Sequence, residues 1–287
     1  VTEPAAIVVN PTITNVACAG GNTGAISISV SGGNGGYTYN WGGGITTQNR
    51  TGLAAGSYSV TVSDALGCTG VNTSSVTQNS SLTINAVAGN VSCNGGSNGT
   101  ITVTPTGGTT PYTFNWGGGI TTQNRSGLTS GICTVTVNDN AGCSGTASAT
   151  ISQPAAISAA TTVTNVSCNG GNNGAISLTV SGGTSPYTFN WGGGINAQNR
   201  TALTAGSYNV TVTDNNLCTA SATASVAQPA AIALSTSKTD VQCNGQSTGS
   251  INLTVSGGTT PYSYMWSNFF NTANISNLSA ATYTVTV

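Results

Sequence analysis

The sequence has no histidine and very little charge, with four basic and five acidic side chains among 287 residues. Histidine is the commonest general acid or base near neutral pH, and the few carboxylates recur at one equivalent position rather than in pairs. Nucleic-acid binding requires clustered basic side chains that neutralise phosphates. The only cations lie far apart in the sequence, at Arg50, Arg125, Arg200 and Lys238. We therefore expect neither an enzyme nor a nucleic-acid partner.

Long apolar runs are also missing. A membrane-spanning helix needs about 20 apolar residues in succession, and no stretch of this sequence approaches that length. The chain does not open on a basic-then-apolar signal segment either. We expect no membrane insertion in this segment, so any anchor lies elsewhere.

The sequence offers no cofactor or metal site. The glycine-rich runs after Cys93 and Trp116 lack the helix that follows a phosphate-binding loop. Zinc sites usually combine several cysteines with histidine, whereas each repeat has too few cysteines and none in Cys-x-x-Cys spacing. We expect no cofactor.

What the sequence does contain is a repeat of 75 residues that needs no gap. Tryptophan marks it at Trp41, Trp116, Trp191 and Trp266. Such a period sets the architecture before any secondary-structure assignment. Short junctions such as Gln153-Pro154-Ala155-Ala156-Ile157 divide the chain into residues 1–78, 79–153, 154–228 and 229–287, the last incomplete. Because residues 1–4 match the junction at 226–229, we expect a piece of a longer array.

Within each repeat, apolar residues alternate with Ser or Thr, as in residues 26–30 and 58–62. That is the period of a half-buried strand. About seven such runs per repeat predict tandem immunoglobulin-like antiparallel β-sandwiches with the tryptophans in the core; a small barrel is the alternative. Proline in the short linkers restricts the backbone on both sides, so we expect the all-β repeats to form an elongated rod.

The cysteines recur in pairs 50 residues apart, which predicts one disulfide within each of the first three repeats: Cys18–Cys68, Cys93–Cys143 and Cys168–Cys218. Closing each loop of about 50 residues would stabilise the fold by roughly 4 kcal/mol. One disulfide per repeat indicates an oxidising compartment. Cys243 should be unpaired here, its partner lying beyond residue 287. Cys133 replaces the tyrosine found at Tyr58, Tyr208 and Tyr283. We expect a buried free thiol there, with an intermolecular bridge as the alternative.

One aspartate per repeat opens a short turn before the second cysteine, at Asp64, Asp139 and Asp214. Aspartate at this position accepts hydrogen bonds from the backbone ahead of it, so we expect turn capping. Calcium binding is the alternative, although calcium prefers several carboxylates. Whether the arginine of each repeat pairs with this aspartate is left open.

Asn-x-Ser/Thr sequons are numerous, but the abundance of Asn, Ser and Thr accounts for most of them. The candidate glycosylation sites are Asn49, Asn90, Asn124, Asn199, Asn209 and Asn274. Covalent glycans there would solubilise a nearly uncharged surface.

Three motifs together resemble one known family. They are Cys-Asn-Gly-Gly-x-x-Gly-x-Ile, Ser-Gly-Gly-x-x-Pro-Tyr-x-(Phe/Tyr)-x-Trp, and Leu-x-x-Gly-x-Tyr-x-Val-x-Val-x-Asp with a closing Cys. The chain resembles the SprB repeat over essentially its whole length. Local departures are Cys133 for Tyr, Gly36 for Pro, Leu217 for Gly and Ile275 for Arg. The resemblance implies a place in very long surface proteins of gliding and related Bacteroidota, exported by the type IX system as filamentous adhesins, with no catalytic residues.

The favoured function is therefore a non-enzymatic structural rod of an extracellular, cell-surface adhesin or filament. Its partners would be further repeats of the same chain or other copies that assemble into filaments. In the alternative, the repeats themselves bind glycans or mineral surfaces through the aromatic residues Tyr37, Tyr112, Tyr187 and Tyr262. The alternation with tryptophan directs these tyrosines inward, which favours core packing. A third reading, ice binding through Thr134 and Thr136, needs a flat face that a twisted sandwich rarely provides.

Overall fold

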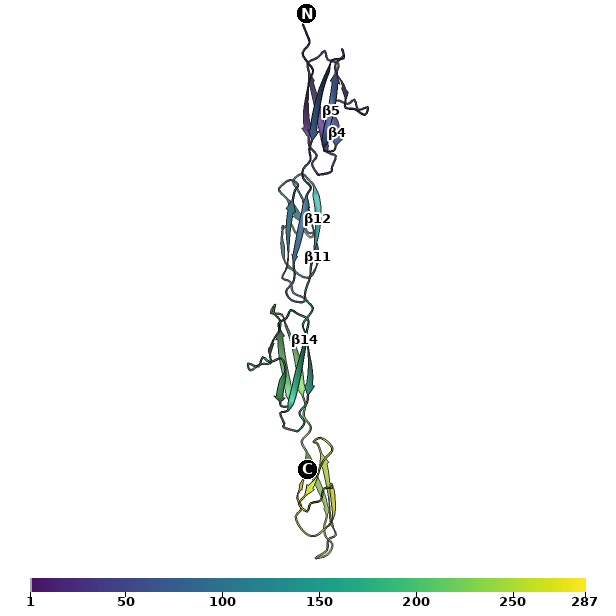
Figure 1. Cartoon of the computed structure of the whole chain (residues 1–287). Coiled ribbons are helices and arrows are strands. Elements are labelled where there is room, and N and C mark those ends of the chain that lie inside the picture. The colour runs from purple at the N-terminus through teal and green to yellow at the C-terminus, as the bar shows by residue number, and fades with distance from the viewer. Residues whose placement is uncertain (1) are drawn as a thin grey trace. The chain divides into compact units, whose positions relative to one another are not determined.

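The computed structural model describes residues 2–287 as strands, turns and loops, with no helix among them (Figure 1). The chain divides into two compact units, residues 1–153 and 154–287. Each unit contains two of the 75-residue repeats, and every hydrophobic core lies within a single repeat. All-β repeats with antiparallel sheets confirm the predicted fold class.

Repeat 1 contains six strands in two three-stranded antiparallel sheets, ordered β1-β2-β4 and β3-β5-β6. Their bounds are β1 Val8–Thr14, β2 Gly24–Ser31, β3 Thr38–Asn40, β4 Arg50–Leu53, β5 Gly56–Ser63 and β6 Thr69–Val76. About seven strands were expected. The segment between β3 and β4 is a loop in which Gly42, Gly43 and Gly44 have φ of 83°, 58° and 81°, a conformation that strands do not adopt.

Repeats 2 and 3 have the same two-sheet plan, ordered β7-β8-β10 with β9-β11-β12, and β13-β14-β16 with β15-β17-β18. In repeat 2 the strands are β7 Thr83–Gly89, β8 Gly99–Thr106, β9 Thr113–Asn115, β10 Arg125–Leu128, β11 Gly131–Asn138 and β12 Ser144–Ile151. In repeat 3 they are β13 Ser158–Thr164, β14 Gly174–Ser181, β15 Thr188–Asn190, β16 Arg200–Leu203, β17 Gly206–Thr213 and β18 Thr219–Val226.

Repeat 4 has five strands, in sheets β19-β20-β22 and β21-β23. They are β19 Ala233–Thr239, β20 Gly249–Ser256, β21 Met265–Trp266, β22 Asn274–Leu278 and β23 Val285–Thr286. Its core is smaller than the other three, and β19 is exposed along its whole length.

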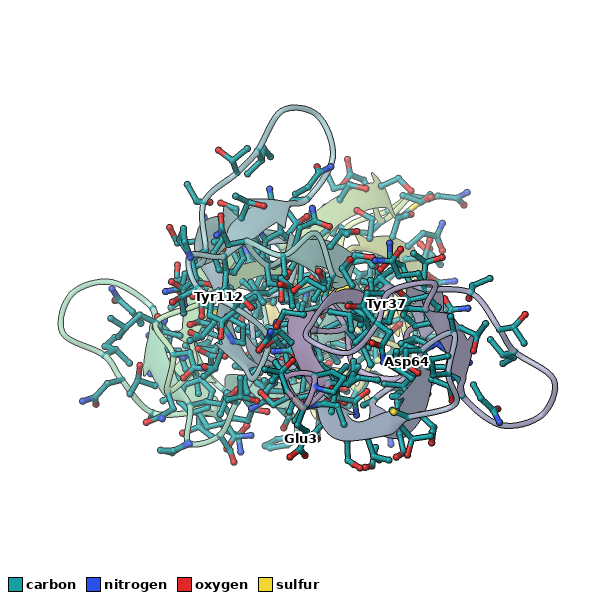
Figure 2. All side chains as sticks on the ribbon, turned by 90° about the horizontal axis from the view of Figure 1, so that it is seen from above. Glu3, Tyr37, Asp64 and Tyr112 are labelled. Carbon is teal, nitrogen blue, oxygen red and sulfur yellow. A yellow bond between two sulfur atoms is a disulfide. The ribbon has the colours of Figure 1, made fainter. Side chains whose placement is uncertain are left out.

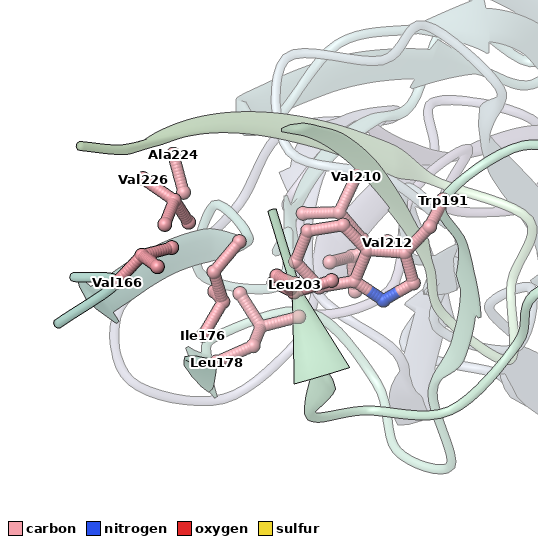
Figure 3. Packing of buried hydrophobic residues seen from close by; sticks show 9 residues of the cluster. All are labelled: Val166, Ile176, Leu178, Trp191, Leu203, Val210, Val212, Ala224 and Val226. Carbon is pink, nitrogen blue, oxygen red and sulfur yellow. The ribbon is translucent and has the colours of Figure 1, made fainter. Parts of the chain in front are cut away.

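The cores follow from the alternation in sequence. In repeat 3, Ile176 and Leu178 of one sheet meet Val210 and Val212 of the other, with Trp191 at the edge of the cluster (Figure 3). The intervening Ser and Thr residues of these strands point away from the core. Burying a Val, Ile or Leu side chain is worth about 1.5–3 kcal/mol, so the sandwich core comes mainly from aliphatic residues.

Tryptophan lies in or against the core of every repeat, buried at Trp191 and Trp266 and partly buried at Trp41 and Trp116. Each indole N–H donates to a backbone carbonyl six residues ahead, for example Trp191 Nε1 to Ala197 O at 2.8 Å. A buried indole needs such a partner, and this bond ties the glycine loop back to the core.

Candidate functional site

In repeats 1 to 3 the ends of the sandwich are held by a few polar side chains, and the aspartate of the second-cysteine turn is the main one. Asp139 is buried, and its Oδ1 accepts hydrogen bonds from the backbone N–H of Ala141 (2.9 Å) and Cys143 (2.8 Å). Its Oδ2 accepts one from Thr109 N–H at 2.8 Å. The carboxylate therefore fixes the turn that carries the second cysteine against the loop that follows β8.

Repeats 1 and 3 repeat this arrangement. Asp64 accepts from the backbone N–H groups of Asn34, Leu66 and Cys68. Asp214 accepts from the backbone N–H groups of Thr184, Asn216 and Cys218. No arginine contacts these aspartates, and no cluster of metal-binding side chains is found in residues 2–287.

These hydrogen bonds set the acidity of the aspartates. Donation by the Asn34 backbone, followed by that of Cys68, holds the pKa of Asp64 below its ordinary value. Burial acts to raise the pKa of Asp139 and Asp214, but the backbone donors outweigh it, so both pKa values are also lowered. Hydrogen bonds to the charged form favour ionisation, and the turn is thus held by carboxylates that stay ionised at neutral pH.

The first cysteine lies on a tight loop at the opposite end of the sandwich. In repeat 1, Gly21 N–H donates to Cys18 O at 2.9 Å, and Gly20 has a φ of 74°. Gly20 N–H donates to Oε1 of Gln78, the residue that ends the repeat, at 2.8 Å. The same glutamine contact recurs from Gly95 to Gln153 and from Gly170 to Gln228, also at 2.8 Å.

These two loops of neighbouring repeats are joined by a disulfide. Cys18 of repeat 1 bonds to Cys143 of repeat 2, across 125 residues of sequence and with 5.5 Å between the Cα atoms. Cys93 and Cys218 are also disulfide-bonded, whereas Cys68, Cys133, Cys168 and Cys243 have free thiols.

The predicted pairing within repeats is therefore wrong: Cys18 does not bond to Cys68, Cys143 is not bonded to Cys93, and Cys168 is free. The reason is that the first-cysteine loop and the second-cysteine turn lie at opposite ends of the same repeat. Val16, beside the first cysteine, pairs with Gln78 at the end of its repeat. The Asp64 turn holds the loop that follows β2, whose Gly33 N–H donates to Ala5 O at the start of the repeat.

Strands of eight residues such as β2 and β5 separate these two ends by about 26 Å. A disulfide needs Cα atoms within about 7 Å. The first and second cysteines of one repeat are therefore too far apart, and the bond forms across the junction to the next repeat.

Side chains of the linker complete the junction in unit 1. Asn79 Nδ2 donates to Ala17 O (3.0 Å) in repeat 1 and to Thr109 Oγ1 (2.9 Å) in repeat 2. In unit 2, Asn169 on the first-cysteine loop of repeat 3 donates to Pro229 O at 3.0 Å. There Cys168 faces a cleft lined by Ala230, Ile232 and Gly258 of repeat 4, among others.

The arginines lie over aromatic rings. The guanidinium carbon of Arg50 is 5.7 Å from the Trp41 ring centroid and 5.1 Å from that of Tyr58. Arg200 is placed likewise over Trp191 and Tyr208, at 5.7 and 5.0 Å. These distances fall within the range of cation–π attraction.

Repeats 2 and 4 depart from this arrangement. Arg125 lies over Trp116 at 5.5 Å, and the position of the second ring is taken by Cys133, a partly buried thiol packed against the core. In repeat 4, Ile275 takes the arginine position and is buried with Trp266.

The tyrosines considered for surface binding form hydrogen bonds within their own repeats. Tyr112, Tyr187 and Tyr262 each donate their hydroxyl to a glycine carbonyl five residues earlier, at 2.5–2.6 Å, and Tyr37 donates to Gly32 O in the same way. Tyr37, Tyr112 and Tyr187 also pack against the cores of their repeats.

All six candidate glycosylation sites also make structural hydrogen bonds. The Oδ1 atoms of Asn49, Asn124, Asn199 and Asn274 accept a backbone N–H from the neighbouring strand at 2.9–3.1 Å. Asn90 Oδ1 accepts from Ser152 N–H, and Asn209 Oδ1 from Thr223 Oγ1. Attachment of sugars at these asparagines stays a prediction.

Comparisons with protein families and with known proteins show what this chain is similar to. The model of the SprB repeat matches residues 10–46, 85–121, 160–196 and 235–269, about half of the chain. A comparison with curated proteins finds no match. Residues 2–287 contain no helix with the length and apolar character of a membrane span.

Among solved structures, the chain is similar to Sidekick-1 immunoglobulin domains 1–5 (11% identity, TM-score 0.38), covering 78% of this chain but only 59% of that structure. It is also similar to a three-immunoglobulin-domain fragment of titin (12% identity, TM-score 0.36), with 79% of this chain and 99% of that one covered. The four regularly spaced matches to the family model decide the family: this chain belongs to the SprB repeat family.

Proposed function

We propose that this chain is a structural segment of an extracellular cell-surface adhesin or filament, in which tandem sandwiches act as a stiff spacer that carries tension. The observation that supports it most is the Cys18–Cys143 disulfide, which joins one repeat to the next rather than closing a single repeat. A bond at that place contributes little to the shape of either sandwich. It does prevent the two repeats from being drawn apart.

The polar contacts at the junction support the same role. Gln78 and Asn79 of the linker form hydrogen bonds with the first-cysteine loop, while Asp139 holds the second-cysteine turn. Both bonded cysteines thus lie on loops fixed by hydrogen bonds, which restricts bending about the linker. Structural disulfides persist in oxidising compartments, which agrees with an extracellular location.

Small-angle X-ray scattering of the oxidised chain tests the stiff-spacer role. If the four repeats lie end to end, with about 35 Å per repeat for strands of about 26 Å and the loops at both ends, the radius of gyration should be near 40 Å. A compact globule of this size would give about 19 Å. A Cys18→Ser variant should keep folded repeats but show a broader distribution of distances. A value near 19 Å for the oxidised chain would contradict the proposal.

A further inference from the structure

The glycine loop and the arginine that follows it are nearly identical in repeats 1 to 3. Residues 41–50 and 116–125 both read Trp-Gly-Gly-Gly-Ile-Thr-Thr-Gln-Asn-Arg, and repeat 3 differs from them at Asn196 and Ala197. By contrast, the buried strands β2 and β8 agree at two of eight positions. Loops normally vary more than the strands they connect, so the uniformity of this loop indicates a requirement beyond core packing.

Hydrogen bonds explain why several of these residues recur. In repeat 1, Gln48 Nε2 donates to Ile28 O at 2.7 Å, and Asn49 Oδ1 accepts the Ile28 N–H at 2.9 Å. The indole N–H of Trp41 donates to the backbone of the loop. These contacts fasten the loop to the sandwich, and none of them involves Arg50.

Repeat 4 shows that the loop forms without the arginine. There the Trp266 N–H donates to Phe270 O at 2.9 Å, as the Trp41 N–H donates to Ile45 O at 3.0 Å in repeat 1. Ile275 stands in place of the arginine, and no run of three glycines follows the tryptophan of repeat 4. The arginine of repeats 1 to 3 therefore meets a requirement other than formation of the loop.

The guanidinium is held by stacking, which leaves its N–H groups unused. Arg50 lies over the rings of Trp41 and Tyr58, at 5.7 and 5.1 Å from their centroids. Within residues 2–287, no arginine side chain forms a hydrogen bond or an ion pair, and none of its nitrogens is buried. A guanidinium has five N–H donors in one plane, and here these donors reach solvent from a fixed position.

The surroundings of this group are open and uncharged. A Cβ added at Gly42, Gly43 or Gly44 would meet no atom within 4 Å, and glycine allows a ligand to approach the backbone closely. Figure 2 shows the glycine loop of repeat 1, in faint purple, standing out from the body of its own sandwich. Thr46 and Thr47, which follow in this loop, are exposed.

We propose that this arginine binds the carboxylate groups of an acidic polysaccharide in repeats 1 to 3. The planar fork of a guanidinium matches a carboxylate through two parallel hydrogen bonds. Because the aromatic rings already hold the fork in place, little side-chain freedom is lost on binding. The exposed threonine hydroxyls then bond to sugar hydroxyls beside the carboxylate.

A polymer is the ligand that suits these sites. One exposed ion pair contributes little, and one arginine per repeat is too few for the phosphates of a nucleic acid. A polyuronate carries a carboxylate on every sugar, so that several arginines of the same chain can bind one polymer. Linked weak sites of this kind gain affinity through multivalency.

Binding of the whole chain to immobilised polygalacturonate tests this inference, measured by surface plasmon resonance at low salt without calcium. The methyl ester of the same polymer, which lacks the charge, should not bind. Arg50→Gln should weaken binding several-fold, and the same change at Arg50, Arg125 and Arg200 together should weaken it about a hundredfold or more. Lys238→Gln removes the same charge outside these sites and should leave binding unchanged.

A lysine variant separates fork recognition from charge alone. Changing the three arginines to lysine keeps a cation over the rings but removes the planar fork, so it should recover little of the binding. A cooperative melting transition shows that each variant is folded, and the lysine variant decides the matter if the glutamine variant is unstable. Absence of binding, equal loss with Lys238→Gln, full binding by the lysine variant, or equal binding to the methyl ester would each overturn the inference.

This site goes beyond the proposed structural role, and the two fail separately. Scattering from the single chain decides whether the repeats form a stiff spacer. A stiff chain that does not bind the polymer would leave only the structural role, whereas a flexible chain that binds it would leave only the site.

Discussion

The disulfide across the junction makes a quantitative prediction for stretching experiments. The Cys18–Cys143 bond shields 125 residues from an applied force and holds their ends 5.5 Å apart at the Cα atoms. At about 3.4 Å per extended residue, breaking it should add about 420 Å to the length of the fully unfolded chain. Cys93 and Cys218 are changed to serine beforehand, so that Cys18–Cys143 is the one remaining disulfide.

The assay is single-molecule force spectroscopy with handles at both ends, with and without a reducing agent. Reduction, or Cys18→Ser, should lengthen the unfolded chain by about 420 Å, whereas Cys68→Ser should have no effect. If pairing were within repeat 1, the loop of 50 residues between Cys18 and Cys68 would release only about 165 Å. Cys68→Ser would then also release it, and that result would refute the junction disulfide.

The same bond should raise stability. In the chain-entropy model, closing a loop of this length is worth about 5 kcal/mol. Because the closed loop includes parts of two repeats, loss of the disulfide should lower their stability and also uncouple their unfolding. Cys18→Ser should therefore split one urea transition of repeats 1 and 2 into two.

Three further predictions concern single repeats. The turn aspartates have folded pKa values below the unfolded value of about 4. Their contribution to stability is present above the unfolded pKa and is lost as the pH falls through the lower folded values. Changing all three to asparagine should therefore reduce the fall in melting temperature as the pH drops below about 4, and an unchanged slope would count against it. Gly182→Ala should lower the free energy of unfolding by about 3 kcal/mol or more, because the added Cβ would lie 2.0 Å from Ala156 O at a residue with positive φ. Gly193→Ala should lower it by only about 1 kcal/mol, because the space around that glycine is open and only the positive φ is unfavourable. Equal effects of the two in urea denaturation would contradict the clash. Cys133→Tyr should stabilise repeat 2 by about 0.5–1 kcal/mol by adding a second ring beside Arg125, a gain in melting temperature that Cys133→Ser should lack.

The strands could be predicted from the sequence because their signal is local. Residues such as Ile26 and Ile28 alternate with serine, and each is buried where the alternation places it. The repeat period then carries one correct assignment to equivalent positions along the chain. Local pattern and fixed period were sufficient for the fold class.

The disulfides could not be predicted in this way, because pairing depends on which end of the sandwich each loop occupies. In a regular repeat, a spacing of 50 residues within a repeat and one of 125 residues to the next are equally constant. The signal that could have decided was the chain path. Cys18 precedes β2, and Cys68 follows β5, so the two lie at opposite ends once both strands are placed.

The partner of arginine was left open for a similar reason. Its position in the sequence does not show that the aspartate oxygens are already occupied by backbone N–H groups. With those acceptors taken, the guanidinium of Arg50 lies over the rings of Trp41 and Tyr58 instead.

The Cys18–Cys143 bond also changes what a protease can achieve. A single cut anywhere between these residues, including the linker at residues 78–81, leaves both fragments attached through sulfur. Shedding of an outer repeat then takes two chemically different events, peptide hydrolysis and thiol reduction. In surroundings rich in proteases but poor in reductants, a nicked chain would stay in one piece.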